Sequence, residues 1–268
     1  MRCLLLLPLL VLWACSGEKS AGPAPTASAA TVPLPVTAAA SVEPPSEARE
    51  VKVSSDLYEF EYAYPAQAAA IPALKAMLDA DITRQQADLR KQAKAAQADA
   101  ASSDFPYHPQ SLYYDWKKVA ETPDWLSLSS LVGSYTGGAH PNYWFAAILW
   151  DKRANRARKA PDLFVSEQVL SAAIIKPFCA ELNRQRAKKR GLPVDPASSD
   201  MFDECIDPVG ETVILGSSNG RSFNRIGILV PPYEAGPYAE GDYEVTLPIN
   251  QALLAAVKPE YRGSFSAQ

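Results

Sequence analysis

The first 50 residues of this chain contain little that could fold, and they confine any globular core to the remainder. Residues 16–49 are nearly all Ala, Pro, Ser, Thr and Val. A segment of this composition buries too little apolar surface to offset the entropy of ordering, and its prolines keep it extended. We therefore predict a disordered tether over residues 15–50 and a folded region of about 218 residues that begins near Val51.

The residues before the tether have the features of a secretion signal. Arg2 precedes an apolar run of about 10 residues, half of the roughly 20 that a bilayer crossing needs. Residues 1–14 are therefore predicted to be a signal peptide. Its end, Leu12-Trp13-Ala14-Cys15, resembles the bacterial lipobox, in which the cysteine is lipidated and becomes the first mature residue. Trp13 is bulky for its place in that motif.

Lipidation of Cys15, with palmitate among the expected acyl chains, would make the mature protein a membrane-anchored lipoprotein. Ser16 stands where enteric-type lipoproteins retained at the inner membrane have aspartate. We therefore expect an outer-membrane anchor facing the periplasm, provided that the cell has two membranes. The alternative is ordinary cleavage near Ala14, which would leave a free thiol in an oxidising compartment.

Two cysteines remain once the signal is removed and Cys15 is lipidated. Cys179 and Cys205 form an even pair, so we predict a disulfide between them. In the chain-entropy model, a loop of this length corresponds to roughly 3–4 kcal/mol of stabilisation. The alternatives are a metal-binding pair or a catalytic cysteine, but there is no CxxC spacing and only His108 or His140 could serve as a histidine partner.

The net charge of −4 gives no electrostatic reason to bind nucleic acid or to coat an anionic membrane. It favours a basic partner, though weakly. The basic run RQRAKKRG resembles a nucleic-acid or heparin patch. It is better explained as the C-terminal end of a helix, where cations are stabilising and Gly191 ends the helix.

The spacing of apolar residues predicts a mixture of strands and helices. Residues 58–64 alternate aromatic and polar side chains, as a half-buried strand does, and a helical stripe follows from Ile71 to Leu89 with Pro72 in the first turn. Residues 126–135 and 143–150 predict a hairpin, and the second of these strands is apolar on both faces, as in the middle of a covered sheet.

The C-terminal half predicts one long helix and three strands. Ser166 is a suitable N-cap, Pro177 should kink or interrupt the helix, and the side chains at positions 169, 170, 173, 174, 178 and 182 should face the core. The strands are expected at 212–215, 225–230 and 243–247, with a short helix near 251–257. The pattern predicts an α+β fold, a largely antiparallel sheet with two main helices packed on it, in two sequential modules at 51–165 and 166–268.

Three stretches carry the most distinctive residues, namely YTGGAHPNYW, LWDKRANRARKAPDLF and ILVPPYEAGPYAEGDYEVTLPI. The motifs in them are Gly137-Gly138-Ala139-His140 with Asp162-Leu163-Phe164, and Pro232-Tyr233-Glu234 with Pro237-Tyr238-Ala239 and Gly241. From about Leu57 to Val257 the chain resembles a family of bacterial extracytoplasmic domains. That family includes the lysozyme-binding ectodomain of the RsiV-type anti-sigma factor of bacilli and the non-catalytic domain of PdaC-type peptidoglycan deacetylases.

The resemblance implies an α+β ectodomain of two sequential modules that works at the cell wall by binding rather than by catalysis. The chain departs from the anti-sigma factor because it has no transmembrane helix and no sigma-binding segment, so signalling by regulated proteolysis is not expected. It also lacks the catalytic domain of the deacetylase, so that activity is not carried over.

No residue pattern in the chain points clearly to catalysis. Two histidines 32 residues apart show no ligand spacing with carboxylates, and no GxSxG elbow is present, so we predict no metal, no cofactor and no hydrolase triad. An acidic pair of the glycosidase kind, Glu234 with Glu240 or Asp242, stays open as an alternative.

Two segments are candidates for a binding site. PPYEAGPYAEGDY combines acids with rigid aromatics, and from it we take Tyr233, Glu234, Tyr238, Glu240 and Asp242 as candidate ligand-binding residues. The alternative is that the tyrosines cover a sheet edge and the acids are solvated.

His140 is a further candidate. We predict that Gly137 and Gly138 give the positive φ of a tight turn, and that His140 is a turn residue whose ring bonds a backbone group or stacks on Tyr143.

The sequence thus predicts a lipid-anchored, non-enzymatic binding protein of the cell envelope, engaging a cell-wall component such as peptidoglycan or a wall hydrolase. Lysozyme is the partner suggested by the resemblance and by opposite charge. The alternatives are a peptidoglycan-modifying enzyme that uses an acidic pair, and an envelope assembly factor. No nucleic acid is expected as a partner, and contact with the membrane is expected through the lipid anchor alone.

Overall fold

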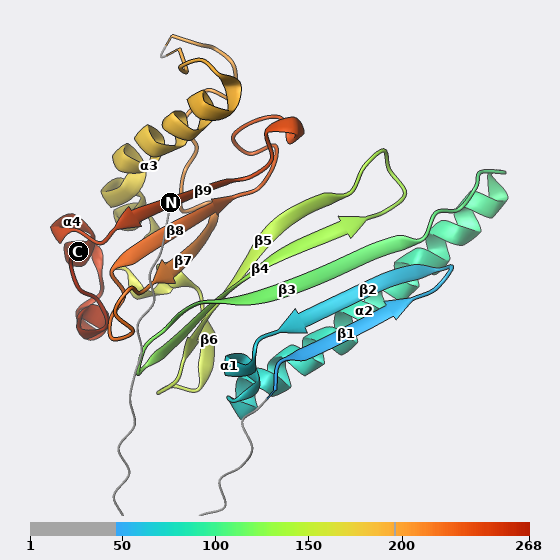
Figure 1. Ribbon diagram of the computed structural model, residues 1–268, viewed down its shortest axis with the longest axis horizontal. Helices are drawn as coiled ribbons and strands as arrows, with labels where there is room; N and C mark the ends of the chain where they lie inside the picture. The colour runs from blue at the N-terminus through green and yellow to red at the C-terminus, as the bar shows by residue number, and fades with distance from the viewer. Residues whose placement is uncertain (1–46, 196) are drawn as a thin grey trace, which may run out of the picture. The chain divides into compact units, whose positions relative to one another are not determined.

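The computed structural model describes residues 47–195 and 197–268, which form two sheets, each with one long helix packed on it (Figure 1). The predicted signal peptide, the lipidation site at Cys15 and most of the predicted tether lie outside the described residues. The first strand begins at Arg49, two residues before Val51, the predicted start of the folded region. The mixed α+β class predicted from the sequence is confirmed.

The first sheet has six strands in the order β1-β2-β3-β4-β5-β6. They are β1 (Arg49–Ser54), β2 (Tyr58–Tyr64), β3 (Gln110–Glu121), β4 (Trp125–Tyr135), β5 (Asn142–Asp151) and β6 (Arg156–Arg158). Neighbouring strands are antiparallel except β2 and β3, which are parallel. The connection between these two contains α1 (Ala66–Ala69) and α2 (Pro72–Ser102), because parallel strands need a long crossover.

The core of the first sheet follows the predicted periodicities. Tyr58, Phe60, Tyr62 and Tyr64 of β2 are buried, whereas Glu59 and Glu61 are exposed on the opposite face. Helix α2 covers the buried face with a stripe made of Leu74, Leu78, Ile82, Leu89 and Ala93. Each fully buried side chain of this size contributes about 1.5–3 kcal/mol relative to exposure, so this stripe fixes which face the helix covers.

The second sheet has three antiparallel strands, β7 (Thr212–Gly216), β8 (Arg225–Val230) and β9 (Tyr243–Pro248). The other elements of this half are η1 (Ala160–Leu163), α3 (Glu167–Arg190), η2 (Tyr238–Glu240), α4 (Gln251–Ala256) and η3 (Pro259–Ser264). Helix α3 begins after Ser166, whose side chain accepts a hydrogen bond from the Val169 amide, and it ends at Gly191 with φ +77°. Both predicted ends of this helix are confirmed.

Helix α3 differs from the prediction at two positions, one in its buried side and one in its continuity. Leu170, Ile174, Phe178 and Leu182 are fully buried at four-residue spacing, but Val169 is 41% exposed because it lies one position off that stripe. Pro177 does not interrupt the helix, which continues from Glu167 to Arg190.

Strand β5 is not the central, covered strand that its composition predicted. Only Leu149, Trp150 and Asp151 pair with β6, so the rest of β5 forms an edge, and Trp144 there is 39% exposed. The central strand β3 was not predicted at all, although its Leu112, Tyr114 and Trp116 alternate toward α2.

The core of the second sheet takes in residues from both halves of the chain. It contains the strands β7–β9 and the buried face of α3, together with Trp125, Leu149, Leu163 and Phe164. The predicted module boundary at residue 165 falls just before Ser166, the N-cap of α3, and stays a prediction. Within the two described ranges, no helix is both long enough and apolar enough to cross a bilayer.

Candidate functional site

Two strand connections that are far apart in sequence meet at one exposed cluster of rings. The turn between β4 and β5 supplies His140 and Pro141, and the connection between β8 and β9 supplies Tyr233 and Tyr238. The Tyr238 hydroxyl donates to the Pro141 carbonyl at 2.8 Å, and the Tyr238 ring stacks on His140 with centroids 4.1 Å apart. The structure thus brings together the two segments that were singled out separately in the sequence.

His140 is held as a turn residue. Its Nδ1 lies 2.8 Å from the Pro141 carbonyl oxygen, which can only accept, so Nδ1 carries a proton. Nε2 is then free to accept from the Tyr233 hydroxyl at 3.3 Å. The predicted bond to a backbone group is present, but the ring stacks on Tyr238 rather than on Tyr143, because the β8–β9 connection lies against the turn.

The backbone of both connections leaves the usual regions in a few places. Gly137 has the predicted positive φ, +92°, whereas Gly138 does not. Tyr233 has φ +75°, which is uncommon for a residue other than glycine. This conformation presents the exposed Tyr233 ring beside Tyr238, with centroids 5.6 Å apart.

Tyr143, the second residue of β5, links the end of the β4–β5 turn to the β8–β9 connection. Its hydroxyl donates to Asp242 Oδ1 at 2.8 Å. Burial, and then the hydrogen bond to the Asp242 carboxylate, raise the pKa of Tyr143 to about 12. Asp242 is therefore engaged inside the protein rather than free for a ligand.

Basic side chains at the C-terminal end of α3 hold the β8–β9 connection in place by hydrogen bonds. Arg190 Nε donates to Glu240 Oε1 at 2.8 Å, and Lys189 Nζ donates to the backbone carbonyls of Glu240, at 2.7 Å, and of Asp242. Arg186 Nε donates to the Ala235 carbonyl at 2.9 Å. The cations predicted to end the helix therefore also hold the connection that bears the tyrosines.

Glu240 accepts from two donors and so is internally satisfied. Besides Arg190, the Tyr243 hydroxyl donates to Glu240. Burial, and then this bond, raise the pKa of Tyr243 to about 12. Lys189 Nζ also lies 3.9 Å from the centre of the Tyr243 ring, a cation–π contact. Of the three acids proposed as ligands, Glu234 is exposed, whereas Glu240 and Asp242 are half-buried.

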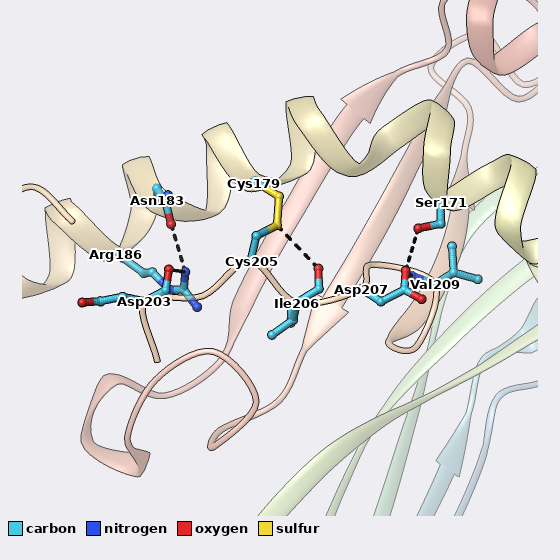
Figure 2. The surroundings of a disulfide bond; sticks show 9 residues. All are labelled: Ser171, Cys179, Asn183, Arg186, Asp203, Cys205, Ile206, Asp207 and Val209. Carbon is cyan, nitrogen blue, oxygen red and sulfur yellow. Dashed lines mark hydrogen bonds between the residues drawn. A yellow bond between two sulfur atoms is a disulfide. The ribbon is translucent and has the colours of Figure 1, made fainter. Parts of the chain in front are cut away.

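The predicted disulfide between Cys179 and Cys205 is present, with Cα atoms 5.6 Å apart. Figure 2 shows the segment around Cys205 running along α3, where the Asp203 carbonyl accepts from Arg186 Nη1 at 3.2 Å. The Asp203 carboxylate pairs with Arg190. The disulfide therefore holds in place a segment that orients two of the three cations that fasten the β8–β9 connection.

A groove of about 560 Å³ lies next to the ring cluster, on the face of the first sheet opposite α2. Its lining includes Glu59 and Glu61 of β2, Tyr113 of β3, and Tyr135 and Pro141 at the β4–β5 turn. Both glutamates are exposed, and Glu61 lies 3.7 Å from Lys52.

The floor of this groove depends on a glycine. A Cβ atom at position 133 would lie 1.9 Å from the Tyr113 ring, so the ring can lie across β4 only because Gly133 has no side chain. Burial, and then Tyr238, raise the pKa of Tyr113. Tyr113 therefore joins the groove to the ring cluster, and together they form what we call the aromatic–acidic surface: Glu59, Glu61, Tyr113, Tyr135, His140, Pro141, Tyr143, Tyr233 and Tyr238.

Sequence reasoning missed the β2 and β3 contribution to this surface. Glu59 and Glu61 alternate with the buried aromatics of β2, so their position on the opposite face could have been inferred. Tyr113 could not be placed, because β3 was not recognised as a strand.

A second hollow lies where β7 begins, beside β5. It measures about 260 Å³ and is lined in part by Glu211, Glu167 and Lys159. Burial, and then the nearby carboxylates of Glu234 and Asp207, raise the pKa of Glu211 to about 7. In the part of the chain that the structure describes, no group of three or more His, Cys, Asp or Glu side chains is arranged to hold a metal ion.

Residues 51–143 match the family model described as Deacetylase PdaC, which confirms the family resemblance inferred from the sequence. A DUF3298 family protein from Bacteroides fragilis NCTC 9343 is similar in structure, with a TM-score of 0.50 and 15% identity over 81% of this chain and 96% of that chain. A DUF3298 family protein from Pseudomonas aeruginosa PAO1 has a TM-score of 0.48 and 15% identity over 84% of this chain and 99% of that chain. At this identity, the likeness to the Bacteroides protein shows a shared fold alone. No curated protein matches the sequence.

Proposed function

We propose, from the PdaC-type domain that residues 51–143 form, that this chain is a lipid-anchored, non-catalytic binding protein of the cell envelope. Its aromatic–acidic surface takes a basic protein that acts on the wall, with lysozyme as the type of partner. The lipobox-like end of the leader, Leu12-Trp13-Ala14-Cys15, supports the anchor, and the Cys179–Cys205 disulfide is in keeping with an oxidising compartment.

The observation that carries the proposal is the convergence of several aromatic rings beside exposed acids. Aromatic side chains held by their neighbours lose little entropy when a partner binds, and they dominate the binding energy of protein interfaces. Tyr233 and Tyr238 are held in this way, and Glu59 and Glu61 lie in the adjoining groove. Acids at the rim accelerate association with a basic partner and help to select it.

Calorimetric titration of the full chain with lysozyme near physiological salt tests the proposal. Weak charge attraction between exposed groups is screened under these conditions. We expect saturable binding with a Kd of about 1 µM or tighter. Tyr238→Ala should weaken it about tenfold or more, because this ring is central to the cluster.

Charge variants separate the acidic contribution from the aromatic one. The double variant Glu59→Gln and Glu61→Gln should slow association, most strongly at low salt, with a smaller effect on dissociation. Glu260→Gln, an exposed acid on η3, is the matched control and should leave binding unchanged. No saturable heat with lysozyme, or equal affinity for the Tyr238→Ala variant, would contradict the proposal.

A second candidate function is a wall-modifying enzyme, and the raised pKa of Glu211 is the observation that favours it. A carboxyl group with a pKa of about 7, beside a second carboxylate and next to a hollow, has the properties of a general acid. The acidic pair would then be Glu211 with Glu234, in place of Glu234 with Glu240 or Asp242. Release of soluble products from isolated cell wall, abolished in Glu211→Gln, would favour this candidate, whereas no release by the unaltered chain would remove it.

A further inference from the structure

The face of the first sheet that lies opposite the aromatic–acidic surface is only partly covered by helix α2. Helix α2 packs on β2 and β3, where Phe60 and Tyr62 are completely buried. Further along the sheet, on the same face, Ala146 and Ile148 of β5 are only half buried and Trp144 is 39% exposed. The space between α2 and the free end of β5 is therefore open on the side away from the aromatic–acidic surface.

A pocket of about 230 Å³ occupies this space. Its sheet side is formed by Tyr114, Ser134 and Trp144. Tyr114 and Trp144 are both paired with Val132, so their side chains lie on the same face of the sheet. Ser134 lies two residues from Val132 on β4 and is paired with Leu112, so it shares that face. Its helix side is formed by Gln85, Asp88 and Gln92, which recur at three- and four-residue spacing and so line one side of α2.

Three polar side chains of the pocket are available to a ligand, whereas Gln85 Nε2 donates to Asp81 Oδ1 at 3.4 Å. Within residues 47–195 and 197–268, Asp88, Gln92 and Ser134 make no side-chain hydrogen bond or ion pair with the protein. The amides and the hydroxyl can each donate and accept, and the carboxylate accepts. Trp144 adds a large exposed ring with an indole N–H at its edge.

The lining selects a class of ligand by its charge and polarity. It contains one acid and no lysine or arginine, which disfavours phosphates, nucleotides and other anions. It has too many amide and carboxyl groups for a lipid tail. A sugar ring suits it, because the C–H face of a pyranose packs on an aromatic ring while its hydroxyls both donate to and accept from planar amide and carboxylate groups.

We propose that the pocket between α2 and β5, formed by Gln85, Asp88, Gln92, Ser134, Tyr114 and Trp144, is a saccharide-binding site that takes a neutral pyranose ring. The pocket is smaller than the roughly 300–1,000 Å³ of sites for drug-sized ligands, so it holds one ring of a longer chain. The site does not rest on the proposed protein partner, because it lies on the other face of the sheet.

Titration calorimetry of the full chain with chitotetraose, cellotetraose and maltotetraose, each in turn, tests the site. We expect saturable binding of at least one of them with a Kd between about 1 mM and about 1 µM. Trp144→Ala should weaken it at least tenfold, whereas Trp144→Tyr, which keeps an aromatic ring, should bind within a few fold of the unaltered chain.

Variants on the helix side provide an independent measurement. Asp88 and Gln92 are exposed on α2, so the double variant Asp88→Asn and Gln92→Ala should fold normally and lose about tenfold or more in affinity. This variant decides the question if Trp144→Ala does not fold. Tyr238→Ala, on the opposite face, is the control and should bind the saccharide as the unaltered chain does.

The outcomes separate this inference from the proposed function. No saturable binding of any of the three saccharides overturns the inference, and so does binding that neither the tryptophan nor the helix variants weaken. Loss of lysozyme binding in Tyr238→Ala with saccharide binding intact supports both proposals. Saccharide binding by a chain that does not bind lysozyme overturns the proposed partner alone.

Discussion

The β8–β9 connection and the β4–β5 turn supply the two sides of the ring cluster, but they are held in different ways. The connection is fastened to α3 by Arg186, Lys189 and Arg190. In the described ranges, the side-chain hydrogen bonds of residues 136–142 are made within the turn and its adjoining strand or to the connection itself. The β8–β9 connection is thus held by helix α3, whereas the β4–β5 turn is held by its contacts with that connection.

This difference shows how the surface is preorganised. A segment whose polar groups are bonded to a helix that packs on the core loses little freedom on binding. A turn held by two hydroxyl contacts and a stacked ring loses more. We therefore expect substitutions near α3 to increase the mobility of both the β8–β9 connection and the β4–β5 turn. Substitutions in the turn should increase the mobility of the turn alone. Amide hydrogen exchange of residues 232–242 and 136–142 measures the two sides separately.

The largest effect is expected from removing the disulfide, which holds the segment that contains Asp203. In the chain-entropy model, Cys179→Ser with Cys205→Ser should lower the free energy of unfolding by roughly 3–4 kcal/mol. Exchange should speed up in the β8–β9 connection and, through it, in the turn. Urea unfolding measures the first effect, and unchanged exchange in residues 232–242 would show that the segment does not support the connection.

Arg186→Ala should have the next largest effect. Arg186 is fully buried, and its loss leaves a cavity and removes donors from the Ala235 and Asp203 carbonyls and from the Asn183 side chain. We expect a loss of about 3 kcal/mol in urea unfolding. Arg184→Ala on the same helix is the matched control.

Arg184 is exposed and pairs only with Glu181 among the described residues, so its removal should cost about 0.5 kcal/mol or less. Equal losses for the two arginine variants would mean that burial of Arg186 does not anchor the connection.

Tyr143→Phe removes the hydroxyl that donates to Asp242 and should cost about 1 kcal/mol. The pKa of Tyr143 is about 12 in the folded chain, above its usual 10, so the unfolded chain loses this proton first. The stabilisation is fully present below about pH 10 and is lost as the pH rises toward 12. The unaltered chain should therefore lose more stability than Tyr143→Phe between about pH 10 and about pH 12. Identical pH profiles for the two would contradict this assignment.

Gly137→Ala should have the smallest effect. Gly137 has φ +92°, which alanine adopts only with strain, but a Cβ there would touch nothing. We expect a loss of about 1 kcal/mol or less, and faster exchange confined to residues 136–142. Faster exchange in residues 232–242 as well would show that the connection depends on the turn, and the contrast between the two sides would fail.

Local pattern predicted most of the fold. The alternation in β2, the stripe of α2 and the caps of α3 were read correctly because each depends on residues close in sequence. Strand β3 was missed because its alternation was not recognised between a loop and a hairpin. The exposure of Trp144 could not be predicted, since it depends on where β6 ends and where α2 lies.

The candidate site was predicted in its parts but not as a whole. Tyr233, Tyr238 and His140 were identified from composition and turn chemistry, yet nothing in the sequence indicated that they touch. The internal bonds of Glu240 and Asp242 depend on Arg190 and Tyr143, which lie 50 and 99 residues away in the chain. Charge alone therefore overestimated how many acids in this segment face a partner.

The parallel pairing of β2 with β3 has a consequence for the order of folding. The β1–β2 hairpin and the β3–β4–β5 meander can each form from neighbouring residues, but they join only after α1 and α2 have closed the long loop between them. Closing such a loop costs entropy before its contacts form. The pairing of β2 with β3 therefore affects the rate of folding more than it affects the final stability. A circular permutant that makes the crossover the new terminus should therefore keep the same contacts and fold at a different speed.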